Sequence, residues 1–192
     1  MRLSTALESP DTKSRYVRRL FSTIADRYDL ITVLLSYGQD RRWKRRLVSM
    51  APIDRGTRAL DLACGTGDIT FALQAAGASS VGLDITARML TIARGKQSPG
   101  RSPVFIVGDM MTLPFHAATF DVVTTGYGIR NVPVIAQSLA EIARVLRPGG
   151  VLLSLDFDRP SNGFVRAGYL AYLTVVGSAL GLVLHGDPDT YR

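Results

Sequence analysis

The nine residues LDLACGTGD, from Leu60 to Asp68, constrain the fold of this chain more than any other segment. An apolar run that ends in an acid and two glycines is typical of a strand of an open α/β sheet turning into a helix. Gly65 and Gly67 let the backbone approach a ligand closely, and the N–H groups that open the next helix can face an anion. The segment therefore predicts a site for an adenosine-containing cofactor. It lacks the third glycine of the G-x-G-x-x-G pattern, which argues against a nicotinamide dinucleotide.

The composition is that of one globular domain with an appendage. Of the 192 residues, 46% are hydrophobic, which is enough to form one sizeable core. Cys64 is the only cysteine, so the chain has no internal disulfide, and the sequence offers no cluster of metal ligands. Together with the lack of a signal-peptide pattern, this predicts a cytoplasmic protein without a metal, in which Cys64 is a small buried residue of the turn.

The formal net charge of +7 is concentrated near the N-terminus. Residues 1–58 contain 13 lysines and arginines against six acidic residues, whereas the rest of the chain is balanced. The densest run is RRWKRR, from Arg41 to Arg46. Such a run can attract anionic lipid head groups or nucleic acid, or can form a solvated helix face, and the sequence leaves all three open.

Apolar runs alternate with helical patterns over residues 58–156, which predicts a doubly wound, mostly parallel α/β sheet of the Rossmann-like class. The predicted strands are 58–63, 80–84, 104–107, 120–125 and 151–156. The predicted helices between them are 68–76, 87–94 and 134–146, the last ended by Pro148, Gly149 and Gly150. Two amphipathic helices, 13–25 and 40–50, precede the sheet and flank a short link at 29–36.

The sequence predicts three parts: a basic helical cap at 1–55, a cofactor-binding α/β domain at 56–160, and an apolar segment at 161–192. Residues 167–184 include no charged side chain and just reach the length of a membrane-spanning helix. Their glycines and tyrosines instead favour a helix that is buried on the domain or lies at a membrane surface. Such a helix would form an apolar wall beside the site.

Acidic residues follow the first three predicted strands, and the carboxyl ends of a doubly wound sheet surround one crevice. Asp84 closes the second strand, and its carboxylate can accept both ribose hydroxyls of a cofactor. Asp109 can take the exocyclic amine of an adenine whose ring packs on Met110. Asp61 is expected to organise the glycine turn or to pair with an ammonium group of the cofactor. Asp84 alone could equally cap a helix, but three acids at consecutive strand ends favour a ligand.

This arrangement resembles the class I S-adenosylmethionine-dependent methyltransferases, in which Thr66 and Gly126 would line the methionine side of the pocket. Residues 28–43, 128–132 and 144–158 (YDLITVLLSYGQDRRW, GIRNV and RVLRPGGVLLSLDFD) are similar to signature stretches of the ubiquinone and menaquinone biosynthesis C-methyltransferase family. The sequence departs from that family at Ile31, Thr32, Asp40 and Asp156, and Asp156 is given no role in the site. Family members continue into a further helix and two strands, so the chain is expected to be truncated.

The resemblance implies methylation of a ring carbon of a reduced polyprenyl quinone, with S-adenosylmethionine as the donor. The quinol would be demethylmenaquinol or 2-polyprenyl-6-methoxy-1,4-benzoquinol. Because an ionised phenol makes the ring carbon nucleophilic, Arg130 is predicted to stabilise the phenolate and Asn131 to orient the guanidinium. Tyr28 and Tyr127 are predicted to flank the ring.

A quinol with an isoprenoid tail lies in the bilayer, so the enzyme is expected to contact the inner face of an anionic membrane peripherally. A homodimer is compatible with the sequence. Nucleic acid is disfavoured as a partner, because TGYGIRN stands where nucleobase amino-methylating enzymes often carry an Asn- or Asp-Pro-Pro-aromatic motif. A small-molecule O- or N-methyltransferase and an inactive S-adenosylmethionine-binding module remain alternatives. His116 and His185 lie outside the motif core and are weak candidates for substrate contact.

Overall fold

The computed structural model describes residues 9–100, 102–158 and 161–185. Contacts divide these residues into two compact units. One unit contains residues 9–26 and 42–156, and the other contains residues 27–41 together with those described from 157 onward. The segment predicted as an N-terminal cap is thereby shared between the two units.

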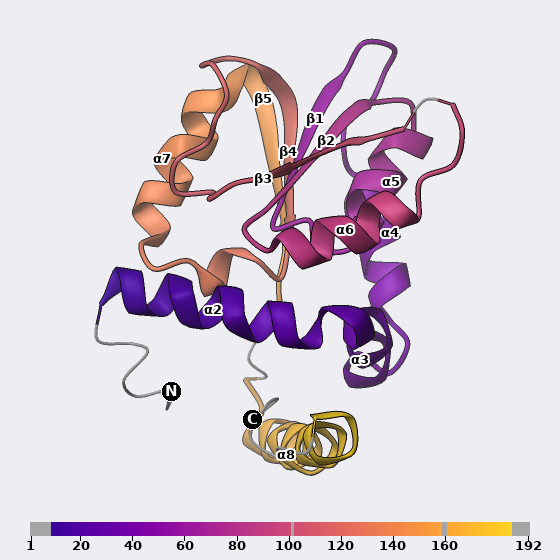
Figure 1. Ribbon diagram of the computed structural model, residues 1–192, viewed down its shortest axis with the longest axis vertical. Coiled ribbons are helices and arrows are strands. Elements are labelled where there is room, and N and C mark those ends of the chain that lie inside the picture. The colour runs from indigo at the N-terminus through magenta and orange to yellow at the C-terminus, as the bar shows by residue number, and fades with distance from the viewer. Residues whose placement is uncertain (1–8, 101, 159–160, 186–192) are drawn as a thin grey trace. The chain divides into compact units, whose positions relative to one another are not determined.

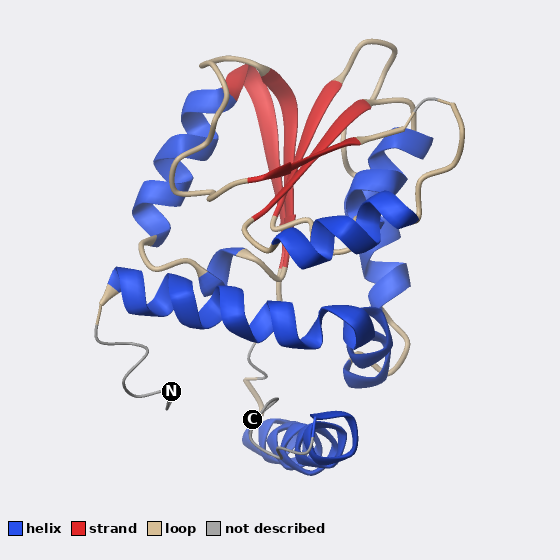
Figure 2. Ribbon diagram, in the orientation of Figure 1, coloured by secondary structure: helices blue, strands red, loops and turns tan. Residues whose placement is uncertain are grey.

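A five-stranded parallel sheet forms the centre of the first unit (Figures 1 and 2). Its strands are β1 (Arg58–Leu62), β2 (Ser79–Asp84), β3 (Val104–Val107), β4 (Phe120–Gly126) and β5 (Leu146–Leu155), in the spatial order β3-β2-β1-β4-β5. β1 therefore pairs with β2 on one side and with β4 on the other. This confirms the predicted doubly wound sheet, whose switch point lies between β1 and β4.

The helices of this unit cover both faces of the sheet. They are α2 (Pro10–Ile24), α4 (Asp40–Ser49, from residue 42 on), α5 (Asp68–Ala75), α6 (Ala87–Gly95) and α7 (Ile135–Val145), with short 3-10 turns η1 (Ala25–Arg27) and η2 (Ile129–Asn131). Ala59 and Val122 face the core formed with α4 and α5, whereas Leu60 and Val123 face the core formed with α7. This alternation follows from the two-residue period of a strand. Figure 1 shows α7 on one side of the sheet and α5 and α6 on the other.

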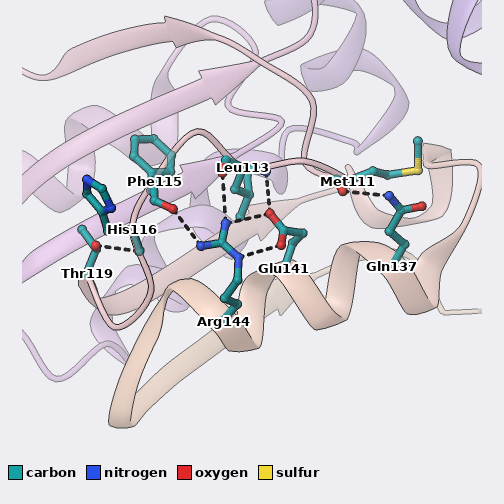
Figure 3. Close-up of polar contacts among 8 residues, drawn as sticks. All are labelled: Met111, Leu113, Phe115, His116, Thr119, Gln137, Glu141 and Arg144. Carbon is teal, nitrogen blue, oxygen red and sulfur yellow. Dashed lines mark hydrogen bonds and ion pairs between the residues drawn. The ribbon is translucent and has the colours of Figure 1, made fainter.

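The segment between β3 and β4 is held on α7 by a polar cluster (Figure 3). Arg144 donates from Nη1 to the carbonyl of Phe115 at 2.8 Å and from Nη2 to the carbonyl of Leu113 at 3.0 Å. Its Nε donates to Oε1 of Glu141 at 2.7 Å, and the backbone N–H of Leu113 donates to Oε2 at 2.7 Å. The bond from Arg144 lowers the pKa of Glu141 to about 2, so this cluster keeps its ion pair at neutral pH. The cluster thereby fixes the point at which β4 begins.

The predicted boundary between the last helix and β5 is wrong, although the other four strands begin and end within one residue of their predicted bounds. α7 ends at Val145, and Leu146 already pairs with Phe120. A register shift follows, and Gly149, with a φ of 81°, lies inside the strand instead of ending the helix. The Pro-Gly-Gly sequence therefore marks a strand irregularity, which has the same local signature as a helix stop.

The second unit consists of two helices, α3 (Tyr28–Leu35) and α8 (Gly163–His185). The short link predicted at 29–36 is thus wrong, because most of it is helical and Thr32 donates its hydroxyl to the carbonyl of Tyr28. Tyr37 stacks on Tyr172 with ring centroids 4.3 Å apart, and the Tyr172 hydroxyl donates to the carbonyl of Leu34 at 3.0 Å. Among the described residues, no helix combines the length and apolar character needed to cross a membrane.

Candidate active site

The turn after β1 is built from residues in the left-handed region of backbone space. Ala63, Gly65 and Gly67 have φ values of 50°, 54° and 90°. The Cys64 N–H donates to the carbonyl of Leu83 at 3.1 Å, which ties the turn to β2. Gly67 also needs its lack of a side chain, because a Cβ there would lie 2.9 Å from the rings of Phe71 and Phe105. The predicted glycine turn is therefore present, and α5 begins directly behind it.

Asp84, at the end of β2, holds this turn in place. Its Oδ2 accepts from the backbone N–H of Gly65 and its Oδ1 from the backbone N–H of Thr86, each at 2.8 Å. The side chain is 7% exposed, and burial raises its pKa. Asp84 thus performs the turn-organising role that the sequence suggested for Asp61, and its carboxylate lies beside the glycines.

Asp61 is buried between β1, α5 and β4. Its Oδ2 accepts from the hydroxyl of Thr70 at 2.7 Å, and its Oδ1 accepts from the hydroxyl of Thr124 at 2.9 Å. Burial raises the pKa of this carboxyl to about 7, an effect that the two hydroxyls and the nearby Lys44 ammonium partly offset.

The other predicted cofactor residues lie at the same edge of the sheet. Asp109 follows β3, and its Oδ1 accepts from the backbone N–H of Met111 at 2.9 Å. Met110 belongs to the buried core and is 7% exposed. Thr66 is buried within the glycine turn, and Gly126 is the last residue of β4. The structure therefore brings the predicted acids of three consecutive strands to one edge.

The turns that follow β1 and β4 touch each other at the switch point. A Cβ added to Gly128 would lie 2.5 Å from the Cβ of Ala63 and 2.8 Å from Oγ1 of Thr125. Tyr127 has a φ of 60°, and its N–H donates to the carbonyl of Leu155 at 2.7 Å. Its side chain is 6% exposed, so in this conformation it packs inside the protein instead of presenting a ring face to solvent.

Arg130 projects from η2, the short turn beyond β4. Its Nε lies 3.3 Å from Oδ1 of Asp156, and its side chain is 55% exposed. Asn131 donates from Nδ2 to the carbonyl of Tyr127 at 3.1 Å, so it stabilises the turn that carries Arg130. Lys13 of α2 donates from Nζ to the carbonyl of Val132 at 2.7 Å and also contacts the carbonyl of Arg130.

Two of these residues are given no role in the site by the sequence alone. Lys13 is one of many N-terminal cations, and its partner lies 119 positions away, so no local pattern could single it out. Asp156 is recognised in the sequence as a strand-end acid and is left without a role, although it stands at the end of the fifth strand as the predicted cofactor acids stand at the ends of theirs. Figure 1 shows α2, which carries Lys13, along the edge where the strands end.

The remaining predicted residues are not all brought to this edge. Tyr28 begins α3 in the second unit, and His185 ends α8 in that unit. His116 lies in the segment before β4, where its carbonyl accepts from the hydroxyl of Thr119, and thus at the opposite edge of the sheet (Figure 3). Burial and the carboxylates of the nearby strand ends raise the pKa of the Cys64 thiol, as expected of a packed cysteine rather than a nucleophile.

Comparison with known proteins identifies the family. Residues 9–192 match the model of the ubiE/COQ5 methyltransferase family. The chain belongs to this family. It is 43% identical to a demethylmenaquinone methyltransferase of Thermus thermophilus, over 90% of this chain and 80% of the relative. A demethylmenaquinone methyltransferase of Staphylococcus aureus is 34% identical, over 92% of this chain and 74% of its own.

Solved structures show the same fold. A methyltransferase of Thermotoga maritima superposes with a TM-score of 0.64 at 23% identity, over 83% of this chain and 70% of its own. A putative methyltransferase of Haloferax volcanii, solved with its Trm112 activator, gives 0.61 at 27% identity, over 70% of this chain and 58% of its own.

The predicted enzyme class and cofactor are thereby confirmed: the chain is a methyltransferase of the S-adenosylmethionine-dependent class. The residues at the edge of the sheet fit this cofactor. S-Adenosylmethionine carries a ribose diol, an exocyclic amine and an ammonium group, and each can be matched by a carboxylate at the end of a strand.

We expect Gly128→Ala to destabilise the protein, because the new methyl group would overlap the Cβ of Ala63 at the switch point. Overpacking of this kind costs about 1–3 kcal/mol in the free energy of unfolding, measured by urea denaturation. Gly95→Ala is the matched control, since nothing lies within 4 Å of a Cβ there, and it should leave stability unchanged or slightly higher. Equal effects of the two substitutions would contradict the close contact between the turns.

Proposed function

We propose that this enzyme methylates a ring carbon of demethylmenaquinol, a reduced polyprenyl quinone. The family and the names of the relatives support this activity. The structural observation that carries the proposal is the pairing of two sets of groups at one edge of the sheet. Buried carboxylates lie at the ends of β1 and β2, while an exposed guanidinium, that of Arg130, follows β4. The carboxylates suit the methyl donor, and the guanidinium suits a methyl acceptor that must become anionic.

In this proposal the strand-end residues hold S-adenosylmethionine, which supplies an electrophilic methyl group. Asp84 accepts the ribose hydroxyls, Asp109 accepts the exocyclic amine, and Met110 packs on the adenine. Asp61 interacts with the ammonium group. Thr66, Gly65, Gly67 and Gly126 line the methionine part. The positions of the acids at consecutive strand ends support these roles, because a bound nucleoside in a doubly wound sheet spans the ends of neighbouring strands.

Arg130 provides the electrostatic complement to the reacting quinol. A ring carbon becomes nucleophilic when the neighbouring hydroxyl ionises, and a fixed cation near the oxygen favours that ionisation. A guanidinium remains protonated at ordinary pH, so Arg130 stabilises the phenolate and does not itself remove the proton. Asn131 and Lys13 hold the turn through backbone carbonyls, which limits how far the guanidinium can move. The contacts of Tyr28 and Tyr127 with the quinol ring stay predictions.

The reaction can be tested with methyl-labelled S-adenosylmethionine and a panel of quinones. We expect label on a ring carbon of reduced demethylmenaquinone and none on the oxidised form, because only the quinol can ionise. Reduced 2-polyprenyl-6-methoxy-1,4-benzoquinone is tested as a second acceptor in the same assay. Label transferred to oxygen or nitrogen would point to a different small-molecule methyltransferase, and cofactor binding without any transfer would point to an inactive binding module.

Two substitutions should separate the acceptor side from the donor side. Arg130→Ala is expected to lower kcat by at least about 10²-fold while the Kd for S-adenosylmethionine changes by less than about twofold, since the guanidinium acts on the transition state. Asp84→Asn is expected to weaken cofactor binding by about tenfold or more through loss of a charged acceptor. Calorimetry and steady-state rates give the two quantities. Arg147→Ala, which removes an arginine paired with Asp121, is the matched control and should change neither.

We further propose that the enzyme meets its quinol at an anionic membrane surface. α4 carries the predicted basic run, and its first arginines are exposed. In the second unit, α8 exposes Phe164, Val165, Leu170 and Val175, and Arg166 is the one lysine, arginine or acidic residue in its sequence. Cations and apolar side chains together support interfacial binding. The predicted cytoplasmic location and homodimer stay predictions.

Membrane association predicts co-flotation with vesicles that contain about one third anionic lipid, and little flotation with neutral vesicles. High salt should reduce the bound fraction, because it screens the arginines. Phe164→Ser should reduce flotation further without changing the cofactor Kd. Protein that remains entirely at the bottom of the gradient with anionic vesicles at low salt would rule this association out.

A further inference from the structure

The ion pair between Arg130 and Asp156 joins the ends of two neighbouring strands. Arg130 lies on the turn after β4, and Asp156 is the residue directly after β5. Nε of Arg130 and Oδ1 of Asp156 are 3.3 Å apart. The side chains are 55% and 24% exposed, so neither charge is sealed inside the protein and both can be reached by a ligand at this edge.

The backbone fixes the relative positions of these two residues. Gly126 of β4 pairs with Leu155 of β5, and the N–H of Tyr127 donates to the carbonyl of Leu155 at 2.7 Å. From the other side, Lys13 of α2 binds the carbonyl of Val132 at 2.7 Å. Because both flanks of the turn are tied, Asp156 and Arg130 reach the same space without a rearrangement of the backbone.

The proposed reaction needs a group that takes the hydroxyl proton of the quinol. Arg130 cannot do so, because its guanidinium is already protonated. Asp61 and Asp84 are buried, and their oxygens accept hydrogen bonds within the cofactor half of the site. His116 lies at the opposite edge of the sheet. Asp156, by contrast, has a carboxylate that can accept a proton and that lies 3.3 Å from Nε of Arg130.

We propose that Asp156 accepts the hydroxyl proton of the quinol, directly or through one water, while Arg130 binds the oxygen that is left negative. This inference rests on the proposed function. As the proton leaves, the electrons of the O–H bond move toward the ring. An electron pair of the ring carbon then forms the new bond to the methyl carbon, and the sulfur keeps the electrons of the S–C bond that breaks. The methylated carbon then loses its own proton to water. The ring oxygen recovers the proton held by Asp156, so one proton is released to solvent per methyl group transferred.

The charge of the pair is consistent with this role. Without substrate, the charges of the Arg130 guanidinium and the Asp156 carboxylate sum to zero. Once the proton has moved to Asp156, the charges of the guanidinium and the phenolate sum to zero in their place. The guanidinium therefore exchanges one anionic partner for another. The charged groups that the described contacts place on this turn are Arg130, Asp156 and, from α2, Lys13.

The test uses Asp156→Asn in the full chain, with methyl transfer to the quinol measured in single turnovers from pH 6 to pH 10. Near neutral pH, we expect the rate to fall by about 10²–10³-fold, the usual contribution of a positioned base. The loss of rate in this variant should become smaller as the pH rises, because a phenol with a pKa of about 10 then ionises without a base. Asp156→Glu should retain the rate within about tenfold.

Asp121→Asn is the matched control, because Asp121 is also paired with an arginine, Arg147 at 2.8 Å, but lies near the start of β4. It should leave the rate unchanged. The Kd for S-adenosylmethionine should stay within about twofold in all three variants, which reports that the fold is intact. A deficit in Asp156→Asn that is the same at every pH would mean that Asp156 only orients Arg130, and an unchanged rate would remove it from the reaction. If the unmodified chain methylates no quinol, the proposed function fails, which is a different result from either.

Discussion

The contact between the turns after β1 and β4 determines where everything else in the site can lie. At a switch point the connections that follow two neighbouring strands lead to opposite faces of the sheet, which in folds of this class opens a crevice at the strand ends. Here Ala63 and Gly128 approach so closely that a methyl group on Gly128 would overlap Ala63. The two turns are therefore in contact, and side chains on either turn are held at a fixed separation. A reaction that joins two molecules across this edge depends on that separation.

Buried carboxylates support this contact from the side of β1. Asp84 binds the N–H groups of Gly65 and Thr86, while Asp61 binds hydroxyls from α5 and β4. Both pKa values are raised by burial, so holding these acids ionised costs folding free energy. An ammonium group beside Asp61 would offset that cost. Binding of a cationic cofactor would thereby be coupled to stability.

Much of this architecture was predictable because it follows local patterns. The glycine turn and the acids at the ends of β1, β2 and β3 are encoded within a few residues of each strand, and the parallel sheet brings these strand ends to one edge. The errors arose where local patterns are ambiguous. Pro148, Gly149 and Gly150 suit a helix stop and a strand bulge equally, and the ITVLL run of α3 is too short to distinguish a helix from a link. The second unit joins segments more than 110 positions apart, for which the sequence carries no local signal.

The distribution of charge across the site accounts for the chemistry that we propose. The acids lie on the cofactor side, where a sulfonium brings a positive charge, and the guanidinium lies on the side where a phenolate forms. Methyl transfer between these two destroys both charges at once, because the sulfonium becomes a neutral thioether and the phenolate a neutral ketone. Water stabilises separated charges more than their neutral products, so it slows such a reaction. A site that assembles both ions with fixed groups and excludes water keeps the benefit of ionisation without that penalty. The tied turn around Arg130 meets the first requirement, because its carbonyls are bound by Lys13 and Asn131 and its guanidinium by Asp156.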